Sequence, residues 1–321
     1  MYLVKAPKHR LDDFYDGLLE GRHNNEKNDY LRSRLIHIKP LLIEAEKKYI
    51  GYRKKLYDLE ESHIIDLPVG VQLDNAMKSY VDTNEMDKVY TEFFVGSPEV
   101  EKVGRVVYDS IISSADYNIC PYCSDRKVMT LDHYLPKSKF ALFAVTPLNL
   151  LPSCSDCNKV KLNKFDPNQE DMLIHPYFED LSTENWLKCD VVEKKWPITF
   201  KYGVRDDIKN LILKARLEAQ FSTLKLNLLY ADNATREFMH RITSIIKEYK
   251  SNPSKNAFYF FDDNKTSYGD INQNSWQTKM FEALMNSTWF SKEALPCLED
   301  NYNEHKRKEE YEKAQNKLLS Q

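Results

Sequence analysis

Residues 120–140 read CPYCSDRKVMTLDHYLPKSKF and begin with a CxxC pair, Cys120 and Cys123. A second pair, Cys154 and Cys157, follows after 30 intervening residues. One CxxC turn directs two thiolates at one ion, and two such turns complete a tetrahedral zinc shell with Zn–S bonds of about 2.3 Å and no open position. We therefore predict a structural Zn²⁺ site at the four cysteines. The alternative is four unrelated reduced thiols.

Other polar side chains in this segment are candidates for chemistry, because a zinc ion with four thiolates has no catalytic position. Asp132 and His133 lie between the two CxxC pairs, as does Asn149, and Asn158 directly follows the second pair. Neighbouring strand residues point to opposite faces, so Asp132 and His133 can serve two different tasks. An imidazole with an ordinary pKa near 6.5 is mostly neutral at pH 7, so His133 can accept a proton from water.

The segments LDHYLPKSKF (131–140) and NLLPSCSDCNKVK (149–161) resemble the pattern of the HNH, or His-Me finger, endonucleases. The resemblance covers residues 120–164 and implies a ββα-metal finger. It assigns His133 as the general base, Asn149 as the asparagine that fixes the His-bearing loop, and Asp132 and Asn158 as ligands of a catalytic divalent ion. Asn158 stands where the pattern often has His. An amide oxygen favours Mg²⁺ or Mn²⁺ over softer ions.

Charge is unevenly distributed along the chain. The formal net charge is -3, yet residues 120–164 contain seven Lys or Arg and three Asp, a net charge of +4. This pattern predicts a local phosphate-binding site, with an ordinary solvated face as the alternative. The four lysines that we expect to contact phosphates are Lys137, Lys139, Lys161 and Lys164.

The residues and the resemblance together predict a metal-dependent HNH endonuclease that hydrolyses phosphodiester bonds of nucleic acid. DNA is the favoured substrate, and RNA or tRNA is the other possibility. The alternative from a different class is a non-catalytic zinc-containing nucleic-acid-binding or scaffold protein. The Asp132-His133 pair and Asn158 separate the two classes, because binding alone does not require them.

The expected fold is mainly α with a small ββα-metal (HNH) finger inserted centrally, α+β overall. We expect a helical N-terminal region at 1–115, the nuclease module at 116–180, and a mostly helical region at 181–321 with a β-hairpin near 189–203. Apolar spacing predicts one helix running from Leu42 after Pro40 to Leu59 and another over 97–115. The C-terminal region is expected to have two helices in 205–250 joined near Asn233, a polar loop over 251–274 and a helix over 275–290.

The sequence also carries expectations about location and partners. It has no run of about 18 apolar residues and no apolar core of a secretion signal near its start, so we predict a cytoplasmic protein with no membrane span. The arrangement resembles HNH effectors of Septu-type bacterial antiphage defence systems. That resemblance implies an ABC/SMC-like ATPase partner, and the sequence leaves the oligomeric state open.

Overall fold

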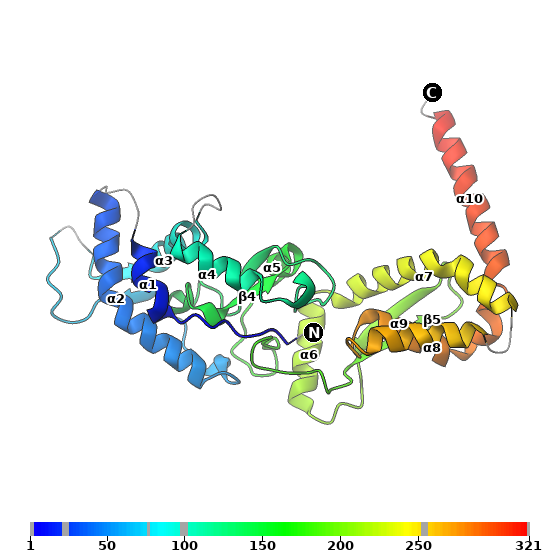
Figure 1. The fold of residues 1–321 in the computed structure, drawn as a ribbon, viewed down its shortest axis with the longest axis horizontal. Helices are drawn as coiled ribbons and strands as arrows, with labels where there is room; N and C mark the ends of the chain where they lie inside the picture. The colour runs from blue at the N-terminus through cyan, green and yellow to red at the C-terminus, as the bar shows by residue number, and fades with distance from the viewer. Residues whose placement is uncertain (1–2, 21–25, 76–77, 97–101, 252–255, 320–321) are drawn as a thin grey trace. The chain divides into compact units, whose positions relative to one another are not determined.

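The computed structural model describes residues 3–20, 26–75, 78–96, 102–251 and 256–319. These residues are mainly helical, and the strands among them form three separate antiparallel pairs, β1–β2, β3–β4 and β5–β6 (Figure 1). The expected α+β class is therefore confirmed. The chain divides into two compact units, one comprising residues 1–183 with 210–224 and the other residues 184–209 with 225–321.

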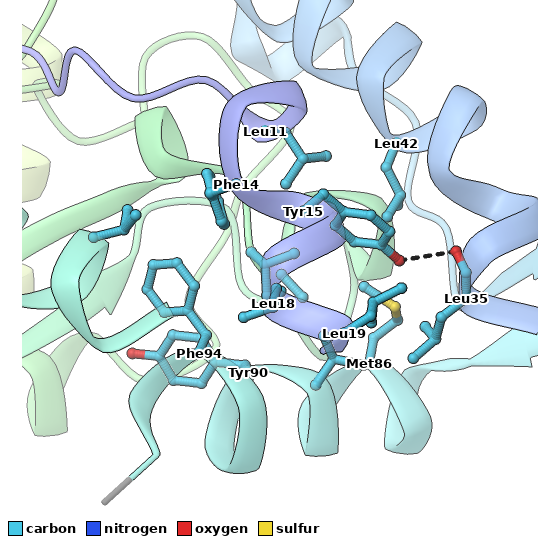
Figure 2. Close-up of a cluster of buried hydrophobic side chains, with 14 of the residues drawn as sticks. Leu11, Phe14, Tyr15, Leu18, Leu19, Leu35, Leu42, Met86, Tyr90 and Phe94 are labelled. Carbon is cyan, nitrogen blue, oxygen red and sulfur yellow. Dashed lines mark hydrogen bonds between the residues drawn. The ribbon is translucent and has the colours of Figure 1, made fainter. Parts of the chain in front are cut away.

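The first unit begins with helices that share one hydrophobic core. They are α1 (Leu11–Leu19), α2 (Glu26–Gly51), α3 (Thr83–Lys88), a π-helical segment (Val89–Val95) and α4 (Val103–Ile112). A short pair, β1 (Ile64–Asp66) and β2 (Tyr80–Asp82), lies between α2 and α3. Leu11 and Tyr15 of α1 lie toward Leu35 and Leu42 of α2, whereas Phe14 lies on the side of Phe94 (Figure 2). The Tyr15 hydroxyl donates to the Leu35 carbonyl at 3.0 Å.

Helix α2 differs from its prediction at both ends. It runs through Pro40 and ends at Gly51, whereas the prediction began after Pro40 and reached Leu59. The buried stripe begins earlier than expected, at residues 31, 35 and 38, and continues through 42, 45 and 49. Pro40 removes the hydrogen bond to the carbonyl of Ile36, and Ile36 is 53% exposed, so water can reach that carbonyl.

A ββα arrangement occupies the centre of the first unit. Strands β3 (Thr130–His133) and β4 (Leu150–Ser153) pair antiparallel, with Asp132 opposite Leu151 and His133 opposite Leu150. Helix α5 (Ser155–Lys161) follows β4 directly. Short 3₁₀ turns cover 116–118 before the strands and 141–143 and 147–149 between them. Leu131 and Leu150 belong to the same buried cluster as α1 and α2, so this module shares its core with the N-terminal helices.

Helix α6 (Leu211–Thr223) is contributed to the first unit by a distant part of the chain. The Arg216 guanidinium pairs with Glu179 at 2.5 Å and donates to the carbonyls of Met172 and Leu173. Gln220 accepts a hydrogen bond from the Ile174 amide at 3.0 Å. These contacts attach α6 to the segment that follows the module.

The second unit is built around the hairpin of β5 (Leu187–Val192) and β6 (Thr199–Val204), as predicted. Helix α7 (Leu226–Ser251) packs on β6 and α9 (Trp276–Asn286) packs on β5. Helix α8 (Asn256–Gly269) packs on α9, and a π-helical turn (Phe290–Ala294) and α10 (Leu298–Leu319) follow (Figure 1).

Two predictions for the second half of the chain are wrong. Asn233 lies inside α7 and is 7% exposed, and the break between helices falls at Lys225, whose φ is 54°. The predicted polar loop over 251–274 contains α8 instead. Its Phe261 is 1% exposed and packs against Phe281, so burial outweighs the polar composition of the segment.

The helix predicted over 97–115 is present as α4 from Val103 to Ile112, and its expected beginning at 97–101 lies outside the described residues. Within the described part of the chain, no helix is long and apolar enough to cross a membrane.

Candidate metal centre and neighbouring polar site

Cys120, Cys123, Cys154 and Cys157 meet at one buried point, as their spacing predicted. Their sulfur atoms all lie within 4.8 Å of one another, and the Cys123 and Cys154 sulfurs are 4.0 Å apart. A tetrahedron with 2.3 Å Zn–S bonds has edges of about 3.8 Å, so the four sulfurs need only a small contraction to coordinate one ion. The buried cluster can therefore hold a metal ion such as Zn²⁺.

Backbone groups around the cluster support thiolate ligands. The Cys157 amide donates to the Cys154 sulfur at 3.3 Å, at the start of α5, and the Arg126 amide donates to the Cys123 sulfur at 3.5 Å. Each CxxC turn thus directs one amide hydrogen at a ligand sulfur. Such bonds stabilise negative charge on sulfur and orient the ligand.

Asp132 lies on the side of β3 that faces α5. It is 2% exposed, and its Oδ2 accepts from the Tyr122 hydroxyl at 2.7 Å and lies 3.0 Å from the Lys161 ammonium. Burial raises the pKa of Asp132, and the positive charge of Lys161 opposes that rise. Its Oδ1 has no hydrogen-bond partner among the described residues.

His133 points away from Asp132 and is 8% exposed. Its Nε2 lies 2.8 Å from the Ala144 carbonyl oxygen. Because a carbonyl only accepts, Nε2 carries the hydrogen and Nδ1 is left with a free lone pair. The ring packs edge-on against Tyr90, with centroids 4.4 Å apart. Burial lowers the pKa of His133 to about 3, so the ring is neutral at pH 7.

Asn149 is fully buried and holds the chain segment that follows His133. Its Oδ1 accepts from the Leu135 amide at 2.8 Å, and its Nδ2 donates to the carbonyls of Leu135 and Phe143 at 3.0 and 3.1 Å. The Tyr134 amide donates to the Asn149 carbonyl at 2.8 Å. Asn149 therefore closes the loop between β3 and β4.

Two further buried residues, Tyr49 and His175, support Asn149. The Tyr49 hydroxyl, on α2, donates to Asn149 Oδ1 at 3.2 Å and lies 3.1 Å from His175 Nε2. His175 Nδ1 accepts from the Tyr177 amide, so Nε2 carries the hydrogen and donates to Tyr49. The result is a buried chain of hydrogen bonds from His175 through Tyr49 to Asn149. A separation of 100 residues leaves no local sequence signal for the contact between Tyr49 and Asn149.

Asn158 comes from α5 and is half-buried. Its Nδ2 lies 3.5 Å from the carbonyl of Leu131, the residue before Asp132. Asn158 Oδ1 has no hydrogen-bond partner among the residues that the structure describes. One carboxylate oxygen and one amide oxygen are donor types that Mg²⁺ and Mn²⁺ prefer.

The four lysines predicted to contact phosphates differ in their surroundings. Lys137 pairs with Asp87 and lies over the Tyr90 ring, and Lys139 pairs with Glu61 at 3.0 Å. Lys161 is 1% exposed, and besides pairing with Asp132 it donates to the His133 carbonyl at 2.6 Å. Lys164 is exposed and makes no ion pair within the described part of the chain. Lys161 thus links the two residues predicted to act in hydrolysis.

Comparison with known proteins gives one distant relative. The chain is 24% identical to Protein ea31 of Escherichia phage lambda over 282 residues, which span 81% of this chain and 90% of that protein. No protein-family model matches the chain, and no solved structure matches it. The name of the relative states no activity.

Proposed function

We propose that the chain is a metal-dependent endonuclease of the HNH type that hydrolyses phosphodiester bonds, with DNA favoured over RNA as substrate. The observation that carries this proposal is the tautomer of His133 together with the residues that surround it. Its hydrogen is fixed on Nε2 by the Ala144 carbonyl, and it adjoins Asp132 on a strand that packs against the helix bearing Asn158. A structural histidine has no need of these neighbours.

His133 would act as the general base through Nδ1. A pKa near 3 makes the isolated ring a weak base, but an anionic phosphate beside the ring stabilises its protonated form and raises that pKa. Ala144 keeps the tautomer constant during proton transfer. The segment after His133 is held by Asn149, which limits the movement of the base relative to the substrate.

Asp132 and Asn158 would hold a Mg²⁺ or Mn²⁺ ion, which when bound stabilises the charge that develops on the leaving oxygen. Lys161 balances part of the charge of Asp132 through Oδ2, and Oδ1 is the atom left for another cation. The four-cysteine cluster lies at the other end of β3 and at the start of α5 and would fix these two elements against each other.

The test compares the purified chain with His133→Ala, with and without Mg²⁺ or Mn²⁺, on supercoiled plasmid, linear duplex, single-stranded DNA and tRNA. His240→Ala is the matched control, because His240 is an exposed histidine of the second unit. We expect metal-dependent cutting by the wild type and His240→Ala, and a loss of at least about a hundredfold in His133→Ala. Equal rates in all three proteins would contradict the assignment, and binding without cutting would favour a non-catalytic zinc module.

We also propose that an ATPase partner controls the nuclease, as the Septu-like resemblance implies. Lys137 pairs with Asp87 and Lys139 pairs with Glu61, so part of their positive charge is neutralised. This neutralisation supports a low affinity of the isolated chain for nucleic acid. Adding the co-expressed ATPase should then raise the rate of nucleic-acid cleavage or make that rate depend on ATP. A purified chain that already cuts efficiently, with no change on addition of the partner, would contradict this part of the proposal.

A further inference from the structure

A cavity of about 350 Å³ lies between the end of α5 and helix α6, within the first unit. Its volume falls within the range of small-molecule sites. Tyr134 and Lys161 form part of its wall. Because the Lys161 ammonium also contacts Asp132 Oδ2 and the His133 carbonyl, the cavity is separated from the proposed catalytic pair by one side chain.

The cavity combines aromatic and apolar surface with one available positive charge. The half-buried Phe165 contributes an aromatic ring, and Tyr134, Met172 and Leu173, which are largely buried, contribute apolar edges. The Phe165 ring is held edge-on by Phe140, with centroids 4.7 Å apart. Aromatic side chains of this kind stack on nucleobases. Lys164 is exposed at the same cavity and can bind one phosphate.

Hydrogen-bonding groups complete the lining. Asp166 and Asp171 contribute carboxylates, and Ser222 and Thr223 of α6 contribute hydroxyls. Carboxylates accept hydrogen bonds from the amino and imino groups of a base, and hydroxyls suit a sugar. Two carboxylates beside a single available lysine disfavour a polyphosphate, and the polar lining disfavours a purely apolar ligand.

We propose that this cavity binds one unstacked nucleotide, with its phosphate at Lys164 and its base among Tyr134, Phe165 and the two carboxylates. Guanine suits the site best, because it presents adjacent imino and amino donors to a carboxylate. The inference rests on the proposed nuclease function only for the source of the nucleotide. If the substrate supplies it, the base has left a duplex stack or belongs to a single strand.

The experiment measures binding rather than cleavage, in the absence of added Mg²⁺. Guanosine 5′-monophosphate, inorganic phosphate and a short fluorescent single-stranded oligonucleotide are titrated into three forms of the full chain: wild type, Ser222→Trp and Leu211→Trp. Ser222 is an exposed residue of the cavity wall, so a tryptophan there fills the cavity without entering the core. Leu211 lies on the same helix, is 75% exposed and is outside the cavity, so it controls for added bulk.

We expect wild type and Leu211→Trp to bind guanosine 5′-monophosphate more tightly than phosphate, and Ser222→Trp to lose at least about tenfold in affinity for it. A parallel loss of oligonucleotide affinity identifies the substrate strand as the source, whereas unchanged oligonucleotide binding identifies a free nucleotide. The proposal is overturned if all three proteins bind guanosine 5′-monophosphate and the oligonucleotide equally well. It is also overturned if the wild type binds guanosine 5′-monophosphate no more tightly than phosphate. Since no cleavage is measured, an inactive chain would refute the nuclease assignment without affecting this result.

Discussion

At the scale of single residues, the position of His133 depends on polar groups that are buried and satisfied. Asn149 uses its amide group to hold both ends of the segment from Leu135 to Phe143, while Tyr49 and His175 fix the orientation of Asn149. Burial makes each of these bonds costly to remove, because an unpaired buried group loses its solvation as well as its partner. The Asn149 amide therefore has a single favoured orientation.

Tyr49→Phe tests whether this chain of bonds positions the site. It leaves Asn149 Oδ1 with one donor fewer and removes the hydroxyl that lies 3.1 Å from His175 Nε2. We expect a stability loss of about 1–3 kcal/mol by urea unfolding. We also expect kcat to fall by about tenfold or more with KM little changed, and faster hydrogen exchange at the Leu135 amide.

Tyr15→Phe is the matched control for this change. Tyr15 is also fully buried in the first unit, and its hydroxyl also donates to a single protein acceptor, the Leu35 carbonyl (Figure 2). It should lose similar stability but keep its kcat and its Leu135 exchange rate. If both variants lose kcat equally, Tyr49 contributes only to folding.

At the scale of secondary-structure elements, the four-cysteine cluster joins the turn before β3 to the start of α5. A metal that binds the folded state and not a preformed unfolded site adds its binding free energy to folding. Helix α5 spans only Ser155–Lys161, too short to be stable alone, yet it carries Asn158 and Lys161. An ion bound at the four cysteines would therefore fix where these two side chains lie relative to β3.

Substitution of Cys157, one of the four clustered cysteines, tests this dependence. We expect Cys157→Ser to lose bound zinc, measured by elemental analysis at about one ion per wild-type chain, and to unfold at a lower urea concentration. Cys297→Ser is the control, because Cys297 is exposed and lies outside the cluster. Equal zinc content in both variants would contradict the assignment of the four cysteines.

Local sequence patterns predicted those elements whose signals are short-range. The CxxC spacing and the hairpin near 189–203 were both identifiable, because each depends on neighbouring residues. Helix α2 before Pro40 and helix α8 were missed, because packing against distant segments stabilises them despite unfavourable local residues. The contacts of Lys137 with Asp87 and of Tyr49 with Asn149 were missed for the same reason.

At the scale of the whole molecule, the first unit has a hydrophobic core that runs from α1 and α2 to β3 and β4. The polar site therefore lies on a scaffold to which the N-terminal helices contribute directly, through Tyr49 among others. Two histidines, His133 and His175, are buried in this unit, and burial lowers the pKa of each to about 3. The stability of the first unit should consequently depend on pH.

The sign of that dependence follows from proton binding. Between about pH 3 and 6.5, the unfolded chain binds a proton at His175 that the folded chain does not. Stability therefore rises with pH in this range and is lost as the pH falls below about 6.5, by about 1.4 kcal/mol per pH unit for each such group. Burial raises the pKa of Asp132, so this group contributes to the pH dependence of stability with the opposite sign. Its contribution cancels when two proteins that differ only at His175 are compared.

His175→Gln should therefore have a lower free energy of unfolding at pH 7 but a smaller loss of it between pH 6 and 4, by about 1.4 kcal/mol per pH unit relative to wild type. Urea unfolding at several pH values measures both slopes. His240→Gln removes an exposed imidazole and should keep the wild-type slope. A His175→Gln slope equal to that of wild type would mean that His175 accepts a proton without unfolding, and the buried bond from its Nε2 to Tyr49 would then not persist in solution.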